Sequence, residues 1–163
     1  MGGDIKQHGC FQADLRQVSK IELLIQHIEE KLGQIDVLIN NAADFFPTPL
    51  GEVSESEWDH LISLNLKAPF FLSQLVGTSM LKQGQGKIVN IADVAAERPW
   101  PQFLPYCASK AGLVSFWQPP SPWLKSTTVC SHGSQESDHG KICKAPSNRA
   151  KCTQRKANID AVQ

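Results

Sequence analysis

A tyrosine and a lysine stand four residues apart in the segment YCASKAGL, as Tyr106 and Lys110. The small and apolar residues around them favour a helix, on which side chains four residues apart emerge from the same face. A tyrosine hydroxyl with an ordinary pKa near ~10 is a weak acid at neutral pH, and a nearby ammonium group lowers that pKa. Tyr106 is therefore predicted to act as a general acid beside Lys110.

Two apolar segments end in polar residues that are suited to join this pair. The segment GKIVNIAD, residues 86–93, ends in Asp93, thirteen residues before Tyr106, and IDVLINNA, residues 35–42, ends in two asparagines and an alanine. Both segments have the nearly continuous apolar pattern of strands that are covered on both faces. Ligands bind at the carboxyl ends of strands in open α/β sheets, so we expect these residues to gather at one edge.

The elements that must position these residues alternate between strand and helix. Six elements are expected: a short strand at 10–15, a helix from Val18 ended by Gly33, the strand at 35–42, a helical stretch from Ser54 to Lys82, the strand at 86–93 and a helix at 104–116. Ser54 and Glu57 have the spacing of a capping box, and Pro69 is expected to break or bend the long helical stretch. The alternation predicts an α/β fold with a parallel sheet.

The combination of NNA, Asp93 and YxxxK resembles the short-chain dehydrogenase/reductase family. The family's pattern falls on Asn40 to Ala43 for NNAG, on Asn65 in the following helix, on Asp93 where most members have Ser, and on Tyr106 with Lys110. Ala43 replaces the glycine of the motif. The aspartate and the segment NNA-x-x-F-x-PTPL look like the pteridine reductase branch, which carries an Asp-Tyr-Lys set.

The resemblance implies a role for each matching residue. It implies catalysis by Asp93, Tyr106, Lys110 and Asn65, cofactor binding by Asp14, Asn41, Ala42, Tyr106 and Lys110, and substrate binding by Phe45, Asp93 and Tyr106. The implied cofactor is NADP(H), with NAD(H) not excluded. Reduction of a pterin C=N bond needs a proton on a ring nitrogen, for which Asp93 is a second source beside Tyr106.

Structural interpretations stand beside these roles. Asp93 suits a helix or loop cap, and Asp14 suits the N-cap of the helix that follows it. The amide of Asn65 suits the backbone groups inside its own helix. Phe45 is favoured as a stacking surface for a flat ring, whereas Phe46 is favoured as a core residue.

The sequence predicts a partial doubly wound domain at residues 1–117. In the segment 118–163, apolar residues do not recur with the spacing of a strand or a helix. No glycine-rich dinucleotide motif is recognised before Phe11, and no family strand is recognised after Trp117. With the first strands of the order 3-2-1-4-5-6 missing, the strand at 10–15 is separated from the strand at 35–42, and edges stay unpaired. We expect impaired activity, and a shifted reading frame is a hypothesis for the last segment, which is predicted to be disordered.

Composition excludes several classes of function. The formal net charge is zero, which argues against nucleic acid as a partner, and the sequence has no apolar run of bilayer length and no signal segment. The five cysteines and the histidines of the last segment match no zinc spacing, so no metal site is expected. A cytoplasmic protein with a small-molecule substrate is predicted, and the resemblance implies a homo-oligomer.

Three functions remain open from the sequence. The first is a pteridine reductase with NADP(H), and the second is a general alcohol or carbonyl oxidoreductase of the same family. The third is a non-catalytic fragment or dimerisation module.

Overall fold

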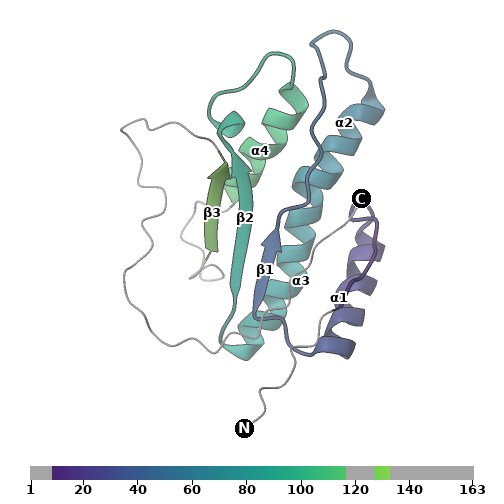
Figure 1. Ribbon diagram of the computed structural model, residues 1–163, viewed down its shortest axis with the longest axis vertical. Coiled ribbons are helices and arrows are strands. Elements are labelled where there is room, and N and C mark those ends of the chain that lie inside the picture. The colour runs from purple at the N-terminus through teal and green to yellow at the C-terminus, as the bar shows by residue number, and fades with distance from the viewer. Residues whose placement is uncertain (1–8, 117–126, 133–163) are drawn as a thin grey trace, which may run out of the picture.

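A computed structural model describes residues 9–116 and 127–132 (Figure 1). The described residues form a parallel sheet of three strands in the order β1-β2-β3, with helices packed against it. Helix α3 (Ala68–Gln83) contacts β1 (Val37–Asn40) and β2 (Lys87–Asp93), and α1 (Val18–Leu32) packs on the far side of α3 (Figure 1). The alternating α/β pattern of the sequence is confirmed in this part of the chain.

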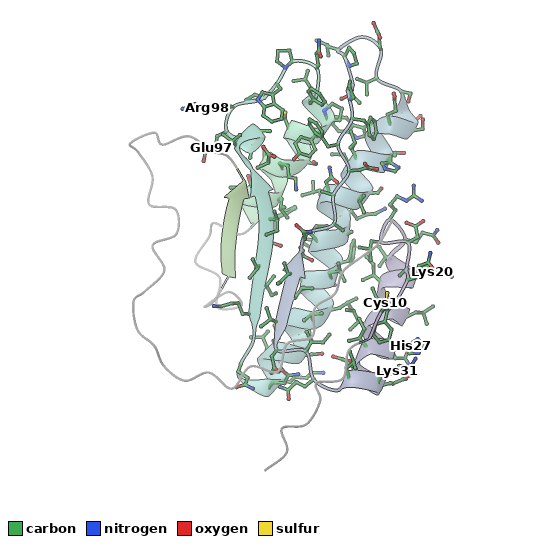
Figure 2. All side chains as sticks on the ribbon, viewed as in Figure 1. Cys10, Lys20, His27, Lys31, Glu97 and Arg98 are labelled. Atoms are coloured by element: carbon green, nitrogen blue, oxygen red, sulfur yellow. The ribbon has the colours of Figure 1, made fainter. Side chains whose placement is uncertain are left out.

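Helix α1 forms as its apolar spacing predicts. Its buried residues are Ile21, Leu24, Ile25 and Ile28, which join the core shared with α3 and β1. Lys20, His27 and Lys31 lie along its outer side (Figure 2). The helix ends at Gly33, whose φ of 79° lies in the region that glycine tolerates best and whose N–H donates to the carbonyl of Glu29.

The long helical stretch begins at the predicted capping box and changes its hydrogen bonding before the proline. Helix α2 (Glu55–Ile62) is capped by Ser54, whose side chain accepts from the Glu57 N–H while the Glu57 carboxylate accepts from the Ser54 N–H. A π-helical turn (Ser63–Lys67) then leads into α3, which has Pro69 in its first turn. Pro69 has no N–H for the carbonyl four residues earlier, and this explains why α-helical bonding is interrupted there.

The strands pair in parallel register, so their carboxyl ends meet at one edge. Residues 37–40 of β1 lie opposite residues 87–90 of β2, so that Asn40 faces Asn90. The Asn40 amide donates to Oδ1 of Asn90 at 2.7 Å and to Oγ of Ser73 at 3.0 Å, which ties β1 to β2 and α3 in the core. The first asparagine of NNA is therefore a structural residue.

Strand β3 (Thr127–His132) lies inside the segment in which the sequence predicts no strand. Residues 88–93 of β2 pair with residues 127–132, in parallel. The segment TTVCSH lacks the continuous apolar run of a buried strand, but pairing with the edge of β2 satisfies its backbone groups without such a run. The expectation of no strand after Trp117 was wrong here, and the rest of 118–163 lies outside the described residues.

Residues 10–15 do not form the predicted strand. They pair with no strand, and the only sheet among the described residues contains β1, β2 and β3. A strand is held by backbone hydrogen bonds to a neighbour, and this segment has no neighbouring strand in the described part of the molecule. It runs instead into a turn in which the Gln17 N–H donates to the carbonyl of Asp14 at 3.2 Å.

The remaining helix and the search for membrane spans complete the fold. Helix α4 (Leu104–Phe116) follows a 3-10 turn (Val94–Ala96) that leaves the end of β2, with Pro105 in the first turn of the helix as predicted. Within the described ranges, no helix combines the length and the apolar character that crossing a bilayer requires.

Candidate active site

Asp93 and Tyr106 meet at the carboxyl end of β2. The Tyr106 hydroxyl donates to Oδ2 of Asp93 at 2.9 Å, and Oδ1 of Asp93 accepts from the Ala95 N–H at 2.8 Å. One carboxylate oxygen therefore caps the 3-10 turn, while the other holds the tyrosine hydroxyl. The cap interpretation of Asp93 therefore holds for Oδ1, and the other oxygen contacts Tyr106. The catalytic role of Asp93 stays a prediction.

Lys110 lies one helical turn after Tyr106 and is almost completely buried, with 5% of its surface exposed. Its Nζ donates to the carbonyl of Ile91 in β2 at 3.0 Å and lies 5.7 Å from the centroid of the Tyr106 ring. The ammonium is thus fixed against the strand that carries Asp93. We call Asp93, Tyr106 and Lys110 the Tyr106 cluster.

The electrostatics of this cluster differ from the sequence-based expectation. Burial, followed by the hydrogen bond to the Asp93 carboxylate, raises the pKa of Tyr106 above its ordinary value of 10.0. Burial also lowers the pKa of Lys110, against the opposing effect of Asp93. The expected lowering of the pKa of Tyr106 by Lys110 was wrong, because burial and the adjacent Asp93 carboxylate both disfavour the phenolate.

Asn65 holds the loop that follows β1. It is 1% exposed, its Oδ1 accepts from the Asp44 N–H at 2.9 Å, and its Nδ2 donates to the Asp44 carbonyl at 2.9 Å. The amide therefore bonds backbone groups, but those of a loop 21 residues away instead of its own helix. Its role in catalysis stays a prediction.

The next residue of that loop, Phe45, belongs to an aromatic group over Tyr106. The Phe45 ring stacks on Phe103 with centroids 4.4 Å apart and meets Tyr106 edge-to-face at 4.8 Å. Trp100 meets Phe45 edge-to-face at 6.0 Å, and the Thr48 N–H donates to the Gln102 carbonyl, which joins the two loops. Phe45 remains 49% exposed, so it is available to a ligand and is not a core residue.

Phe46 turns to the other side of the loop, where its ring meets His60 edge-to-face with centroids 5.8 Å apart. It is half-buried, and it packs against a polar side chain instead of entering the core.

A cavity of about 660 Å³ opens between the segment before α1 and the loop after β1. We call it the loop cavity. Its lining consists of Gln12, Ala13, Asp14, Leu15, Arg16, Asn41, Ala42, Ala43, Asp44, His60 and Leu64. The structure therefore brings together Asp14, Asn41 and Ala42, the three residues predicted to bind only the cofactor.

The Asp14 carboxylate is occupied by neighbours from its own turn. It accepts from Nε and Nη2 of Arg16 at 2.9 and 3.0 Å and from Nε2 of Gln17 at 3.1 Å. The bond to the Arg16 side chain is the main cause that holds the pKa of Asp14 well below its usual range. Gln17, not Asp14, occupies the N-cap position of α1, so the N-cap interpretation of Asp14 was wrong.

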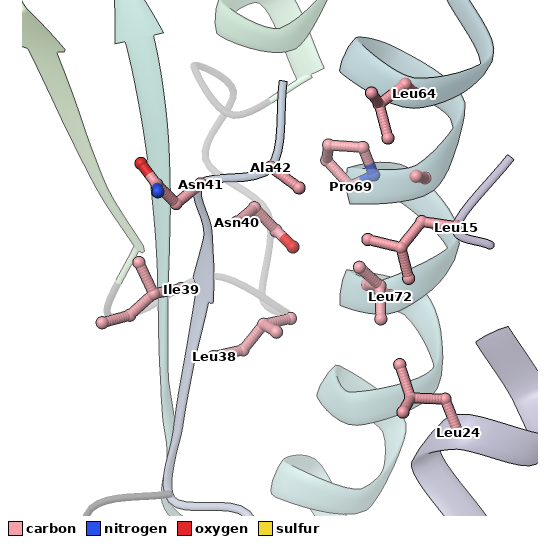
Figure 3. Close-up of a pocket in the computed structure, with 11 residues that line it drawn as sticks. Leu15, Leu24, Leu38, Ile39, Asn40, Asn41, Ala42, Leu64, Pro69 and Leu72 are labelled. Atoms are coloured by element: carbon pink, nitrogen blue, oxygen red, sulfur yellow. The ribbon is translucent and has the colours of Figure 1, made fainter. Parts of the chain in front are cut away.

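A narrower apolar groove lies beside the loop cavity, between β1 and α3 (Figure 3). Leu15 and Leu24 face it from the segment and helix that precede β1, and Asn41 and Ala42 lie at its upper end (Figure 3). Asn40 lines the same groove, and its Oδ1 is buried without a hydrogen-bond partner among the described residues.

Sequence reasoning missed four side chains of this region: Arg16 and His60 in the loop cavity, and Trp100 and Phe103 beside Phe45. Arg16 and His60 are 44 residues apart, and no local spacing connects them. Trp100 and Phe103 lie in the segment between Asp93 and Tyr106. This position between two predicted site residues could have indicated that they lie near the site. Among the described residues, no group of three metal-ligating side chains is found.

Comparison with known proteins identifies the family that the chain resembles. The family model described as short chain dehydrogenase matches residues 3–129. D-threitol dehydrogenase of Mycolicibacterium smegmatis is 36% identical over 114 residues, which cover 70% of this chain and 44% of that protein. Gluconate 5-dehydrogenase of Gluconobacter oxydans is 45% identical over 86 residues, covering 53% of this chain and 34% of that protein.

A solved structure extends the likeness to the fold. The crystal structure of a short chain dehydrogenase from Bacillus anthracis matches with a TM-score of 0.61 and 34% identity, covering 64% of this chain and 44% of that one. The predicted Rossmann-like α/β fold is confirmed. The chain spans less than half the length of these relatives. Their names point to polyols, sugar acids and alcohols and give no support to the pteridine reductase branch.

Proposed function

We propose, from the premise that this chain belongs to the short-chain dehydrogenase family, that it interconverts a secondary alcohol and a carbonyl group on a polyol or sugar acid. The family acts on small molecules and uses NAD(P) nucleotide cofactors. The relatives named for D-threitol and gluconate support the substrate class. The general oxidoreductase is thereby preferred to the pteridine reductase.

The observation that carries the proposal is the hydrogen bond between Tyr106 and Asp93. A bound nicotinamide would accept a hydride from the alcohol carbon, or donate one to the carbonyl carbon. In the oxidative direction the Tyr106 oxygen receives the proton of the alcohol while its own proton passes to Oδ2 of Asp93. In the reductive direction both protons move back, so that the carbonyl oxygen becomes a hydroxyl.

Asp93 matters here because the pKa of Tyr106 is raised. A tyrosine that resists ionisation is a poor base when it acts alone, but a carboxylate at 2.9 Å can take its proton in the same step. Lys110 holds positive charge beside the pair and is anchored to the carbonyl of Ile91. The cluster thus moves a proton without leaving a free phenolate.

The described residues fit part of a dinucleotide site. The loop cavity lies at the carboxyl end of β1, where open α/β sheets bind ligands, and polar groups of Asp14, Asn41 and Arg16 line it. These residues and Ala42 would hold the cofactor, together with Tyr106 and Lys110. The proposed cofactor is NADP(H) or NAD(H), and a cytoplasmic homo-oligomer is part of the proposal.

The test is an assay of the full chain with D-threitol, gluconate and related polyols in the presence of NAD⁺ or NADP⁺. Formation of reduced nicotinamide by the natural chain, and its absence in Tyr106→Phe, is the expected result. If the dinucleotide binds but no polyol or sugar acid is oxidised, the proposed substrate class is wrong. If a folded chain binds no dinucleotide, the third function, a non-catalytic fragment, takes its place.

A pterin is the second candidate substrate. The half-exposed Phe45 ring beside Tyr106, with a carboxylate as an additional proton source, favours a flat nitrogen heterocycle. Reduction of a dihydropterin with NADPH, lost in both Phe45→Leu and Asp93→Ser, is the expected result for this substrate. A chain that oxidises polyols and leaves dihydropterins unchanged would exclude it.

A further inference from the structure

His60 contacts both walls of the loop cavity. It lies on α2, with Nδ1 3.1 Å from Nη1 of Arg16 in the segment before α1. Its Nε2 lies 2.7 Å from Oδ2 of Asp44 in the loop after β1. The two walls are far apart in sequence, and neither belongs to a strand, so side-chain contacts have to set the distance between them.

The chemistry of the two partners fixes the protonation of the ring. A guanidinium has only N–H donors, so Nδ1 of His60 must accept from Arg16. A neutral imidazole has one donor and one acceptor, so the proton resides on Nε2 and is donated to the Asp44 carboxylate. The observed contacts are satisfied by the neutral ring in one tautomer. A doubly protonated ring would set an N–H against the guanidinium N–H.

We propose that His60, with its ring proton on Nε2, is a positioning residue that ties the two walls of the loop cavity together. The charged groups in contact with the ring are Arg16 from the segment before α1 and Asp44 from the loop after β1. Asp14 does not contact the ring, but its carboxylate accepts from the Arg16 guanidinium and so holds Arg16 in place.

The Asp44 side of the tie reaches the Tyr106 cluster. Asn65 holds the backbone of Asp44, His60 holds its carboxylate, and the next residue, Phe45, meets the Tyr106 ring. His60 touches none of the reacting groups itself. Its effect on dinucleotide binding rests on the proposed function, whereas the tie between the walls does not.

The tautomer is tested by nitrogen NMR of the histidine rings at about pH 8, where an ordinary imidazole is neutral. The chain has five histidines, so the His60 signals are assigned as those missing from His60→Gln. We expect the proton on Nε2 and an unprotonated Nδ1. A proton on Nδ1 at this pH would overturn the proposal, because Arg16 could then not donate to the ring.

The tie itself is tested by a double-mutant cycle of Arg16→Met and His60→Leu, using urea unfolding. At about pH 8 we expect the two residues to be coupled by about two- to tenfold in the unfolding equilibrium constant, the range of one net hydrogen bond. Absence of coupling between the two residues would contradict the tie.

His60→Gln is the matched control. A glutamine amide has an acceptor for Arg16 and a donor for Asp44, so its coupling to Arg16 should be close to that of the natural histidine. For dinucleotide binding, fluorescence titration with NADPH should show weaker binding in His60→Leu and rescue in His60→Gln. If NADPH binds to none of these chains, the proposed function fails. The NMR measurement of the tautomer and the double-mutant cycle still test whether His60 ties the two walls together.

Discussion

The Tyr106 cluster and the loop cavity are assembled in different ways. The cluster comes from one strand and the helix that follows it, so thirteen residues of chain separate its two reacting groups, and each is anchored within β2 or α4. The cavity is formed by segments outside the strands, and its walls meet through a contact between residues 44 positions apart. One region is held by regular structure, and the other is held by side-chain contacts between α2 and two loop segments.

This difference has consequences for both regions. Backbone hydrogen bonds of β2 and α4 hold the cluster whether or not a ligand is bound, which preorganises a proton-transfer site. The cavity walls depend on a few polar contacts, each of which contributes little alone, so their spacing responds to substitution. Catalytic and binding changes should therefore be separable by mutation.

The largest effect is expected from Tyr106→Phe. The substitution removes the hydroxyl that exchanges the proton and keeps the ring that packs on Phe45, so turnover should fall about 10²- to 10⁴-fold. The affinity for NADPH, measured by fluorescence titration, should fall much less than turnover, because Tyr106 is only one of the residues proposed to hold the cofactor and the loop cavity is intact. A loss of NADPH affinity as large as the loss of turnover would contradict the distinction between the Tyr106 cluster and the loop cavity, since the two regions would then act as one.

Asn65→Ala should destabilise the fold by about 1–3 kcal/mol, because both backbone groups of Asp44 lose their partners in a partly buried place. Urea unfolding measures the loss. The control is Ser115→Ala at an exposed site on α4, where a change within about 0.5 kcal/mol is expected. Equal stability of the two variants would show that the contacts of Asn65 with Asp44 do not stabilise the loop that forms one wall of the loop cavity.

Asp93→Asn tests the electrostatics of the cluster. Tyr106 is the only tyrosine of the chain, so the ultraviolet absorbance of tyrosinate reports on this residue alone. The natural chain should form tyrosinate above the ordinary range, and Asp93→Asn should form it at lower pH, because the amide carries no charge and still caps the 3-10 turn. An unchanged titration would mean that burial alone raises the pKa.

The same shift fixes the sign of a stability change in alkali. The pKa of Tyr106 is higher in the folded than in the unfolded chain. The neutral tyrosine therefore stabilises the folded state, and this contribution is complete below about pH 10, the ordinary pKa of tyrosine. This contribution is lost as the pH rises toward the folded-state pKa, and urea unfolding in alkali should show a smaller loss for Asp93→Asn.

The smallest effect is expected from Ser54→Ala, at about 1 kcal/mol of unfolding free energy. The substitution removes the capping box of α2, the helix that carries His60, and leaves β2 and α4 untouched. Urea unfolding should detect the loss, and the tyrosinate titration should not change. Ser19→Ala, at an exposed position in α1, is the control and should be neutral.

Local patterns predicted most of the regular elements. The apolar spacing of α1, the capping box of α2, the strands β1 and β2 and the proline at the start of α4 are all found where the sequence places them. Residues 10–15 and β3 were predicted wrongly, because a strand depends on a neighbouring strand that its own residues do not specify. The segment 10–15 has no such neighbour among the described residues, and residues 127–132 have one.

The sequence by itself determined the family and the proximity of Asp93, Tyr106 and Lys110, because strand ends and helical spacing are local properties that place those side chains on one edge. Only the tertiary structure decided the contacts and the electrostatics of these side chains. The raised pKa of Tyr106, the hold of Asn65 on Asp44 and the contact of His60 with Arg16 all depend on burial and on distances between segments far apart in the chain. Desolvation and hydrogen-bond strength vary steeply with such distances, and residue spacing in the sequence does not contain them.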